Sequence, residues 1–258
     1  MAALSFPLCI VLFGINDVYD YPSDLVNPRK SGTLAEGIVL PPAYHGFVIR
    51  AGIVSSAITI SASCLPYISA ASAARTWQAG ILAVSTAALI AFAWMYSAPP
   101  FRLKERPMMD SLSNALMVWL AWFIGFTSSS TLTGVMRGLE DVPLEVNMLT
   151  LVATGVHALG AAADIEADES AGYKTVATVL GRQLCAVYGA MVYAVALSTE
   201  MRLTVIGVYF LGGLCTMVSV CVWPSPARVH RGFQITFFGT MVMGALWVVT
   251  GMKDMEIK

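Results

Sequence analysis

The chain has 258 residues, of which 57% are hydrophobic and 12% are charged, and its formal net charge is −1. Soluble domains carry about 25% charged residues, so this composition favours a protein that lies in a lipid bilayer. The near-neutral charge argues against a protein that binds nucleic acid, since such proteins usually present a basic surface.

The apolar runs of the sequence predict its architecture. A helix needs about 20 apolar residues to cross the hydrocarbon of a bilayer, and lipid offers the backbone no other hydrogen-bond partner. In chain order the predicted spans are residues 1–16, 47–69, 78–97, 111–132, 146–163, 183–199, 203–223 and 233–251. The first span reaches full length only if its helix continues into Asn16–Asp24. The sequence therefore predicts an all-α, multi-pass transmembrane bundle of about eight helices, in a single membrane-embedded domain over residues 1–258.

The first predicted span leads into an acidic motif, Asn16–Asp24, with the sequence NDVYDYPSD. On a helix, Asp17, Asp20 and Asp24 fall at positions i, i+3 and i+7, which form one stripe. Pro22 lies inside the motif and removes a backbone donor, so a kink there would take Asp24 off the stripe.

A second acidic motif, Asp164–Asp168, follows the span 146–163 and spaces two carboxylates at i and i+4. Four crossings separate the two motifs, so both are predicted to lie on the same side of the membrane. Carboxylates near a bilayer cost about 2.5–3.5 kcal/mol each at mid-depth, and clustering adds repulsion. A bound Mg²⁺, which prefers oxygen ligands, offsets these costs. A solvated acidic helix end explains either motif alone, but two at matching positions favour a metal site.

Basic and aromatic residues on the same side complete a candidate site for a diphosphate. Lys104 follows Tyr96–Pro100, and Lys174 follows the second motif. A metal ion together with Lys or Arg is the usual means of stabilising the charge on a diphosphate leaving group. Tyr19 and Tyr96 are expected near the site, where a ring face would stabilise a carbocation.

The distribution of charge predicts the orientation in the membrane. Ten of the 15 Lys and Arg residues fall on the side of the acidic motifs, which the positive-inside rule assigns to the cytosol. We therefore expect an integral membrane protein whose active-site loops are cytosolic. His157, seven residues before Asp164, is interpreted as a packing residue, and a proton-removing base is the alternative.

These motifs resemble those of a known family. Asn16–Asp24 resembles the NDxxDxxxD motif of the UbiA superfamily of membrane prenyltransferases, and Asp164–Asp168 resembles its second Asp motif. The segments Tyr96–Lys104 (YSAPPFRLK) and Asn27–Lys30 (NPRK) are most similar to the branch that includes lycopene elongases. Members of the family usually have nine helices, so we expect the first to be missing from this chain.

The resemblance implies Mg²⁺-dependent transfer of a prenyl group from an isoprenoid diphosphate to an aromatic or isoprenoid acceptor within the membrane. The metal ligands that it implies are Asn16, Asp17, Asp20, Asp24, Asp164 and Asp168. Of these, the expected catalytic residues are Asp17, Asp20, Asp164 and Asp168. The expected substrate-binding residues are Asn16, Tyr19, Tyr96, Lys104 and Lys174.

Two other functions fit part of the pattern. A terpene cyclase of the same superfamily would ionise the diphosphate with the same motifs but would need no acceptor. A cation transporter or channel is a third alternative. It is disfavoured because a conduction path should also place ionisable residues at mid-depth, and here they gather at one face of the membrane.

Overall fold

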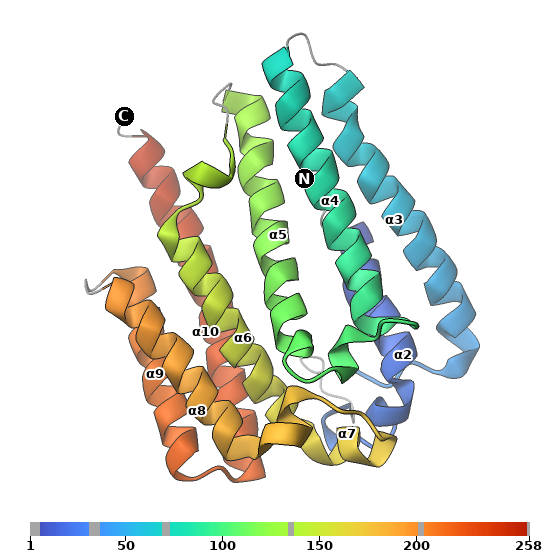
Figure 1. The fold of residues 1–258 in the computed structure, drawn as a ribbon, viewed down its shortest axis with the longest axis vertical. Coiled ribbons are helices and arrows are strands. Elements are labelled where there is room, and N and C mark those ends of the chain that lie inside the picture. Colours follow the sequence, from blue (N-terminus) through green and yellow to red (C-terminus); the bar gives the residue numbers. More distant parts are fainter. Residues whose placement is uncertain (1–5, 31–36, 69–72, 134–136, 201–203, 257–258) are drawn as a thin grey trace. The chain divides into compact units, whose positions relative to one another are not determined.

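A computed structural model describes residues 6–30, 37–68, 73–133, 137–200 and 204–256 (Figure 1). Over these residues the chain is helical and contains no β-strand ladder. Six of the described helices are long and apolar enough to cross a membrane. This confirms the predicted all-α, multi-pass membrane fold. The chain divides into two compact units: residues 1–142 with 166–172 form unit 1, and residues 143–165 with 173–258 form unit 2.

Unit 1 begins with a continuous helical run made of α1 (Phe6–Cys9), a π-helical turn η2 (Ile10–Gly14) and α2 (Ile15–Asp24). The run confirms that the first predicted span continues into the first acidic motif. Its apolar side chains, among them Leu8 and Val11, pack in a core with residues of the long helices that follow. Those helices are α3 (His45–Ile68), α4 (Ala73–Ser97) and α5 (Met109–Thr133).

A close approach between α2 and α3 sets the position of the first motif. A Cβ atom on Gly52 of α3 would lie 2.6 Å from Cδ1 of Ile15, so only glycine allows the two helices this separation. Ile15 is fully buried and directly precedes Asn16, where the motif starts. The polar end of α2 is therefore held in place by apolar packing at its buried end.

Short segments complete unit 1. Three single-turn 3₁₀ helices lie in its connections, η3 (Pro28–Lys30), η4 (Pro42–Tyr44) and η5 (Leu103–Glu105), and η6 (Leu139–Asp141) follows α5. The short helix α7 (Ile165–Ala171) returns the chain to this unit, because residues 166–172 belong to it.

Unit 2 contains α6 (Leu144–Ala163), α8 (Val176–Thr199), α9 (Val205–Val222) and α10 (Pro226–Glu256). Its core is almost entirely apolar and includes Leu159, Tyr193, Phe210 and Met217. A Cβ atom on Gly213 would lie 2.1 Å from Cε1 of Tyr193, so glycine lets α9 approach α8 closely. The predicted spans match these helices, although α8 begins seven residues earlier than expected and α10 extends further at both ends. The single domain stays a prediction.

Candidate active site

The first acidic motif keeps its predicted stripe. The helix α2 runs through Pro22 and ends at Asp24, so the motif is helical along its whole length. Nζ of Lys30 lies 3.1 Å from Oδ1 of Asp17 and 3.1 Å from Oδ2 of Asp24. One ammonium group reaches both carboxylates because positions i and i+7 face the same way on a helix.

Burial and charge act against each other at this pair. Asp24 is 6% exposed, and its burial raises the pKa of the carboxyl to about 6 although Lys30 lies beside it. The negative charges of Asp20 and Asp17 contribute to the same rise. For Lys30, burial alone would lower the pKa, but the charges of Asp17 and Asp24 and its hydrogen bonds to them outweigh burial and raise it. Lys30 is therefore a stable cation against the motif.

The middle carboxylate of the motif has a different partner. Nζ of Lys104 donates to Oδ1 of Asp20 and forms an ion pair with it. Lys104 is 6% exposed, and its burial lowers the pKa of the ammonium, an effect that Asp20 offsets in part. The lysine reaches Asp20 from η5, which begins after Arg102 adopts a left-handed backbone conformation with φ of 44°. Lys104 therefore lies at the first motif, as the sequence predicted.

The end of α4 is tied to α2 by hydrogen bonding. Oγ of Ser97 donates to Oδ1 of Asn16 at 3.0 Å, which fixes the first residue of the motif. Tyr96 directly precedes Ser97 at the end of α4. Tyr19, on α2, is half-buried within the motif. Tyr96 is therefore next in the chain to a residue that contacts the first motif.

The second motif is split by a break in the helix. The helix α6 ends at Ala163, its capping residue Asp164 has φ of −107° and ψ of 6°, and α7 begins at Ile165. Asp164 and Asp168 therefore lie on opposite sides of a helix break. Oδ1 of Asp168 accepts a hydrogen bond of 2.9 Å from Oγ of Ser23, next to Asp24. Asp168 therefore joins the carboxylates of the first motif within unit 1.

Two predicted residues belong to unit 2 instead. Asp164 is half-buried at the end of α6. Lys174 is exposed and precedes Thr175, whose side chain caps α8 by accepting a hydrogen bond from the Thr178 amide. Their proximity to the carboxylates of unit 1 stays a prediction, as does the role of His157 on α6.

The gathered side chains form an all-oxygen donor set. Within the described residues, no three His, Cys, Asp or Glu side chains are close enough together to hold a metal ion directly. Instead, two lysine ammonium groups lie against three carboxylates of the first motif. Carboxylate and amide oxygens suit Mg²⁺, which keeps several water ligands and is commonly shared with substrate phosphates. The chemistry of the donor set therefore fits a magnesium diphosphate. The two lysine ammonium groups already contact the carboxylates of this set.

Sequence reasoning missed three polar residues of this region. Lys30 was counted among the basic residues of its side and quoted in the segment Asn27–Lys30, but it was not expected to contact Asp17 and Asp24. Ser23 lies inside the motif, but its contact with Asp168 spans 145 residues of chain. Asp110, at the start of α5, is 1% exposed and accepts a hydrogen bond from the Ser111 amide. No periodic pattern in the sequence indicates any of these contacts.

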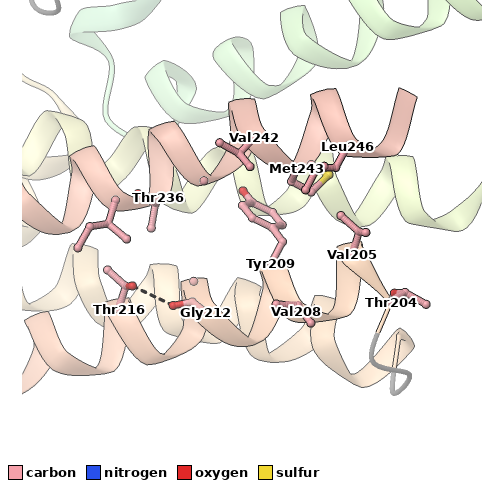
Figure 2. Close-up of a pocket in the computed structure, with 13 residues that line it drawn as sticks. Thr204, Val205, Val208, Tyr209, Gly212, Thr216, Thr236, Val242, Met243 and Leu246 are labelled. Atoms are coloured by element: carbon pink, nitrogen blue, oxygen red, sulfur yellow. Dashed lines mark hydrogen bonds between the residues drawn. The ribbon is translucent and has the colours of Figure 1, made fainter. Parts of the chain in front are cut away.

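Unit 2 has a groove of a different character between α9 and α10 (Figure 2). Its volume is about 440 Å³, and the residues that line it are apolar or carry hydroxyl groups. Figure 2 shows Tyr209 of α9 pointing toward Val242 and Met243 of α10. The Tyr209 hydroxyl accepts a hydrogen bond from Tyr193 and is paired with Thr240. This groove suits an apolar chain but offers no acid, base or metal ligand.

Comparison with known proteins adds to this geometry. The model of the UbiA prenyltransferase family matches residues 1–235. A lycopene elongase/hydratase from Corynebacterium glutamicum is 34% identical over 176 residues, which cover 68% of this chain and 55% of the relative. A lycopene elongase/hydratase from Halobacterium salinarum is 34% identical over 187 residues, covering 72% and 59% of the two chains. The chain spans little more than half the length of these relatives.

Further similarities agree with these. The C(50) beta-cyclic carotenoids biosynthesis protein LbtBC of Dietzia sp. is 36% identical over 192 residues, covering 74% of this chain and 40% of that protein. The structure of a UbiA homolog from Archaeoglobus fulgidus bound to DMAPP and Mg²⁺ matches with a TM-score of 0.56 and 17% identity. The match covers 93% of this chain and 84% of the homolog, and it shows that the two share a fold.

Proposed function

Because this chain belongs to the UbiA prenyltransferase family, we propose that it transfers a prenyl group from an isoprenoid diphosphate to a hydrophobic acceptor within the membrane, with Mg²⁺ as cofactor. The observation that carries the proposal is the gathering of Asp17, Asp20, Asp24 and Asp168 at one end of unit 1, in contact with lysines. Six apolar helices long enough to span a bilayer place this polar cluster in a protein with access to membrane-dissolved substrates.

The acceptor that we propose is a long isoprenoid such as lycopene. The relatives named as lycopene elongase/hydratases support it, since they are 34% identical to this chain over about 180 residues. A polyene acceptor dissolves in the hydrocarbon and reaches the site from the bilayer.

In this proposal the carboxylates of both motifs are magnesium ligands, and two lysines bind the diphosphate. Asn16, Asp17, Asp20 and Asp24 would hold magnesium from α2, and Asp164 and Asp168 would hold it from the second motif. Bound magnesium neutralises the charge that develops on the leaving diphosphate. Lys104 would bind a phosphate oxygen, and Lys174 another.

The reaction needs a site that tolerates a cation after the diphosphate leaves. The allylic C–O bond breaks, the electron pair stays on the diphosphate, a double bond of the acceptor attacks the cation, and a proton is lost. Tyr96, beside Ser97, and Tyr19, on α2, would stabilise the cation with the faces of their rings. The released diphosphate would carry the counter-charge, held by the magnesium ligands and the lysines.

Product analysis tests the proposal. Membranes that contain the chain would be incubated with Mg²⁺ and dimethylallyl, geranyl, farnesyl or geranylgeranyl diphosphate, with and without lycopene, and extracts would be analysed by mass spectrometry. We expect a prenylated product that requires both the diphosphate and the acceptor, and that is absent when Asp17 is replaced (Asp17→Ala). A cyclic product that forms without an acceptor would show that the chain is a terpene cyclase and not a prenyltransferase.

We also propose that the loops around the carboxylates face the cytosol, in line with the ten basic residues on that side. A single cysteine introduced at the exposed Arg106 would report the orientation by its labelling with a membrane-impermeant reagent. We expect labelling only when the cytosolic side is accessible, and labelling from the outer side of intact cells would reverse the assignment.

A further inference from the structure

Lys30 contacts both ends of the acidic stripe, Asp17 and Asp24. Nζ of Lys30 lies 3.1 Å from an oxygen of Asp17 and 3.1 Å from an oxygen of Asp24. The Lys30 side chain is 20% exposed and that of Asp24 is 8% exposed, so much of the contact is shielded from water. Shielding strengthens the attraction, since screening by solvent is reduced.

The backbone between α2 and Lys30 is folded to bring the lysine back. The Leu25, Val26 and Asn27 amides each donate to a carbonyl of the preceding turn. Oδ1 of Asn27 accepts a hydrogen bond of 3.0 Å from the Arg29 amide, and the Lys30 amide donates to the Asn27 carbonyl. These local bonds reverse the chain within six residues of Asp24. The lysine is therefore placed by its loop and does not reach the carboxylates as a long side chain from elsewhere.

A lysine in this place uses the same oxygens that a divalent cation would need. Mg²⁺ requires its ligand oxygens at about 2.0–2.1 Å in near-octahedral geometry, with little tolerance for distortion. An ammonium group 3.1 Å from those oxygens would repel the ion and share its ligands. The ion and the Lys30 ammonium therefore exclude one another at Asp17 and Asp24.

We propose that Lys30 is an internal competitor for the metal, so that its ammonium must leave Asp17 and Asp24 before a divalent cation can bind both. The inference rests on the proposed function, because it takes these carboxylates as metal ligands. Its consequence is that the metal alone binds weakly. A metal diphosphate binds better, because the phosphate oxygens give the released ammonium a new negative partner.

Lys104 is the natural comparison within the same site. Its side chain is 7% exposed, and it forms an ion pair with Asp20, the middle carboxylate of the motif. Movement of Lys104 would leave a buried charge without compensation, whereas the more exposed Lys30 can exchange its partner at lower cost. The competitor role therefore belongs to Lys30 and not to both lysines.

Binding of Mn²⁺ to the purified full chain, followed by electron paramagnetic resonance without any diphosphate, tests the competition. We expect the Lys30→Gln variant to bind Mn²⁺ about five- to a hundredfold more tightly than the unaltered chain, the usual range for coupled sites. Lys30→Arg keeps the positive charge and should resemble the unaltered chain. Arg106→Gln removes a positive charge from an exposed side chain of the same unit and controls for the general loss of charge.

A second readout follows the lysine itself. Lys30 should react faster with an amine-directed acylating reagent when Mn²⁺ is present, as measured by mass spectrometry of the digested chain. This measurement needs no variant and so does not depend on how Lys30→Gln folds.

The outcomes separate the two proposals. If Mn²⁺ binds and supports turnover, but Lys30→Gln binds it no more tightly and the acylation of Lys30 is unchanged, the competition is wrong and the proposed function stands. If Arg106→Gln tightens Mn²⁺ binding as much as Lys30→Gln, the effect comes from net charge in general, and the competition is wrong. If no variant binds Mn²⁺ and no product forms with any divalent metal, both proposals fail.

Discussion

The two units of the chain differ in the kind of polar contact that they contain. In unit 1, charged side chains gather at the ends of helices, where Asp20 pairs with Lys104, and Asp17 and Asp24 share Lys30. In unit 2, the buried hydroxyl of Tyr193 bonds to that of Tyr209, so this network between helices is neutral. Charges need ion pairs and access to water, while a hydroxyl needs only one hydrogen-bond partner.

This difference indicates where chemistry is possible. A neutral hydroxyl network within apolar helices stabilises packing but has no charge with which to bind a metal or a diphosphate. The carboxylates of unit 1 are costly unless compensated, and the two lysines compensate them. The carboxylates and lysines that contact one another therefore lie in unit 1, and substitutions there and in the hydroxyl network of unit 2 should have different consequences.

The largest expected effect tests the stripe on α2. Asp24→Ala should lower turnover about 100- to 1000-fold, as severely as Asp17→Ala, because the helix continues through Pro22 and both residues contact Lys30. Product formation at saturating diphosphate measures it, with membrane insertion checked in parallel. A mild Asp24→Ala beside an inactive Asp17→Ala would show that the proline separates the two residues in function.

The buried ion pair should dominate stability. Asp20→Asn should destabilise the chain by about 3 kcal/mol, because it leaves the Lys104 ammonium, only 7% exposed, without its carboxylate. Thermal unfolding in detergent measures the loss. The double variant Asp20→Asn with Lys104→Met should recover most of this stability while remaining inactive, and failure to recover would place the cost outside the pair.

A smaller effect is expected where the second motif meets the first. Ser23→Ala removes the hydrogen bond of 2.9 Å to Asp168 and should lower turnover about tenfold, since a hydrogen bond to a charged group contributes about 1.5–3 kcal/mol. The buried Ser63 bonds only to its own helix in the contacts described, so Ser63→Ala is a matched control. Equal effects of the two changes on turnover would argue that the hydrogen bond from Ser23 to Asp168 does not contribute to activity.

The smallest effect is expected in unit 2. Tyr209→Phe removes the hydroxyl that joins Tyr193 to Thr240 and should cost about 0.6 kcal/mol of stability, the average for hydrogen bonds between membrane helices. Turnover of the folded protein should be unchanged. A large loss of turnover with stability intact would give the groove between α9 and α10 a direct part in binding substrate, and the comparison of the two units would fail.

Much of the fold was predictable because helix formation is local. Apolar runs long enough to cross a bilayer predict helices whatever surrounds them, since lipid leaves the backbone no other hydrogen-bond partner. The stripe of Asp17, Asp20 and Asp24 follows from helical spacing alone. The spacing of Asp164 and Asp168 did not reveal the break between them, where α6 ends at Ala163 and α7 begins at Ile165. Their role as metal ligands stays a prediction.

The sequence by itself therefore determined the helices, the acidic stripe and the type of side chain available for a diphosphate. Only the tertiary structure decided which partners those side chains have. Lys30 returns to Asp17 and Asp24 because hydrogen bonds at Asn27 reverse its loop. Ser23 meets Asp168 across 145 residues because α7 returns to unit 1. Such pairings depend on how loops close and helices pack, which no spacing along the chain encodes.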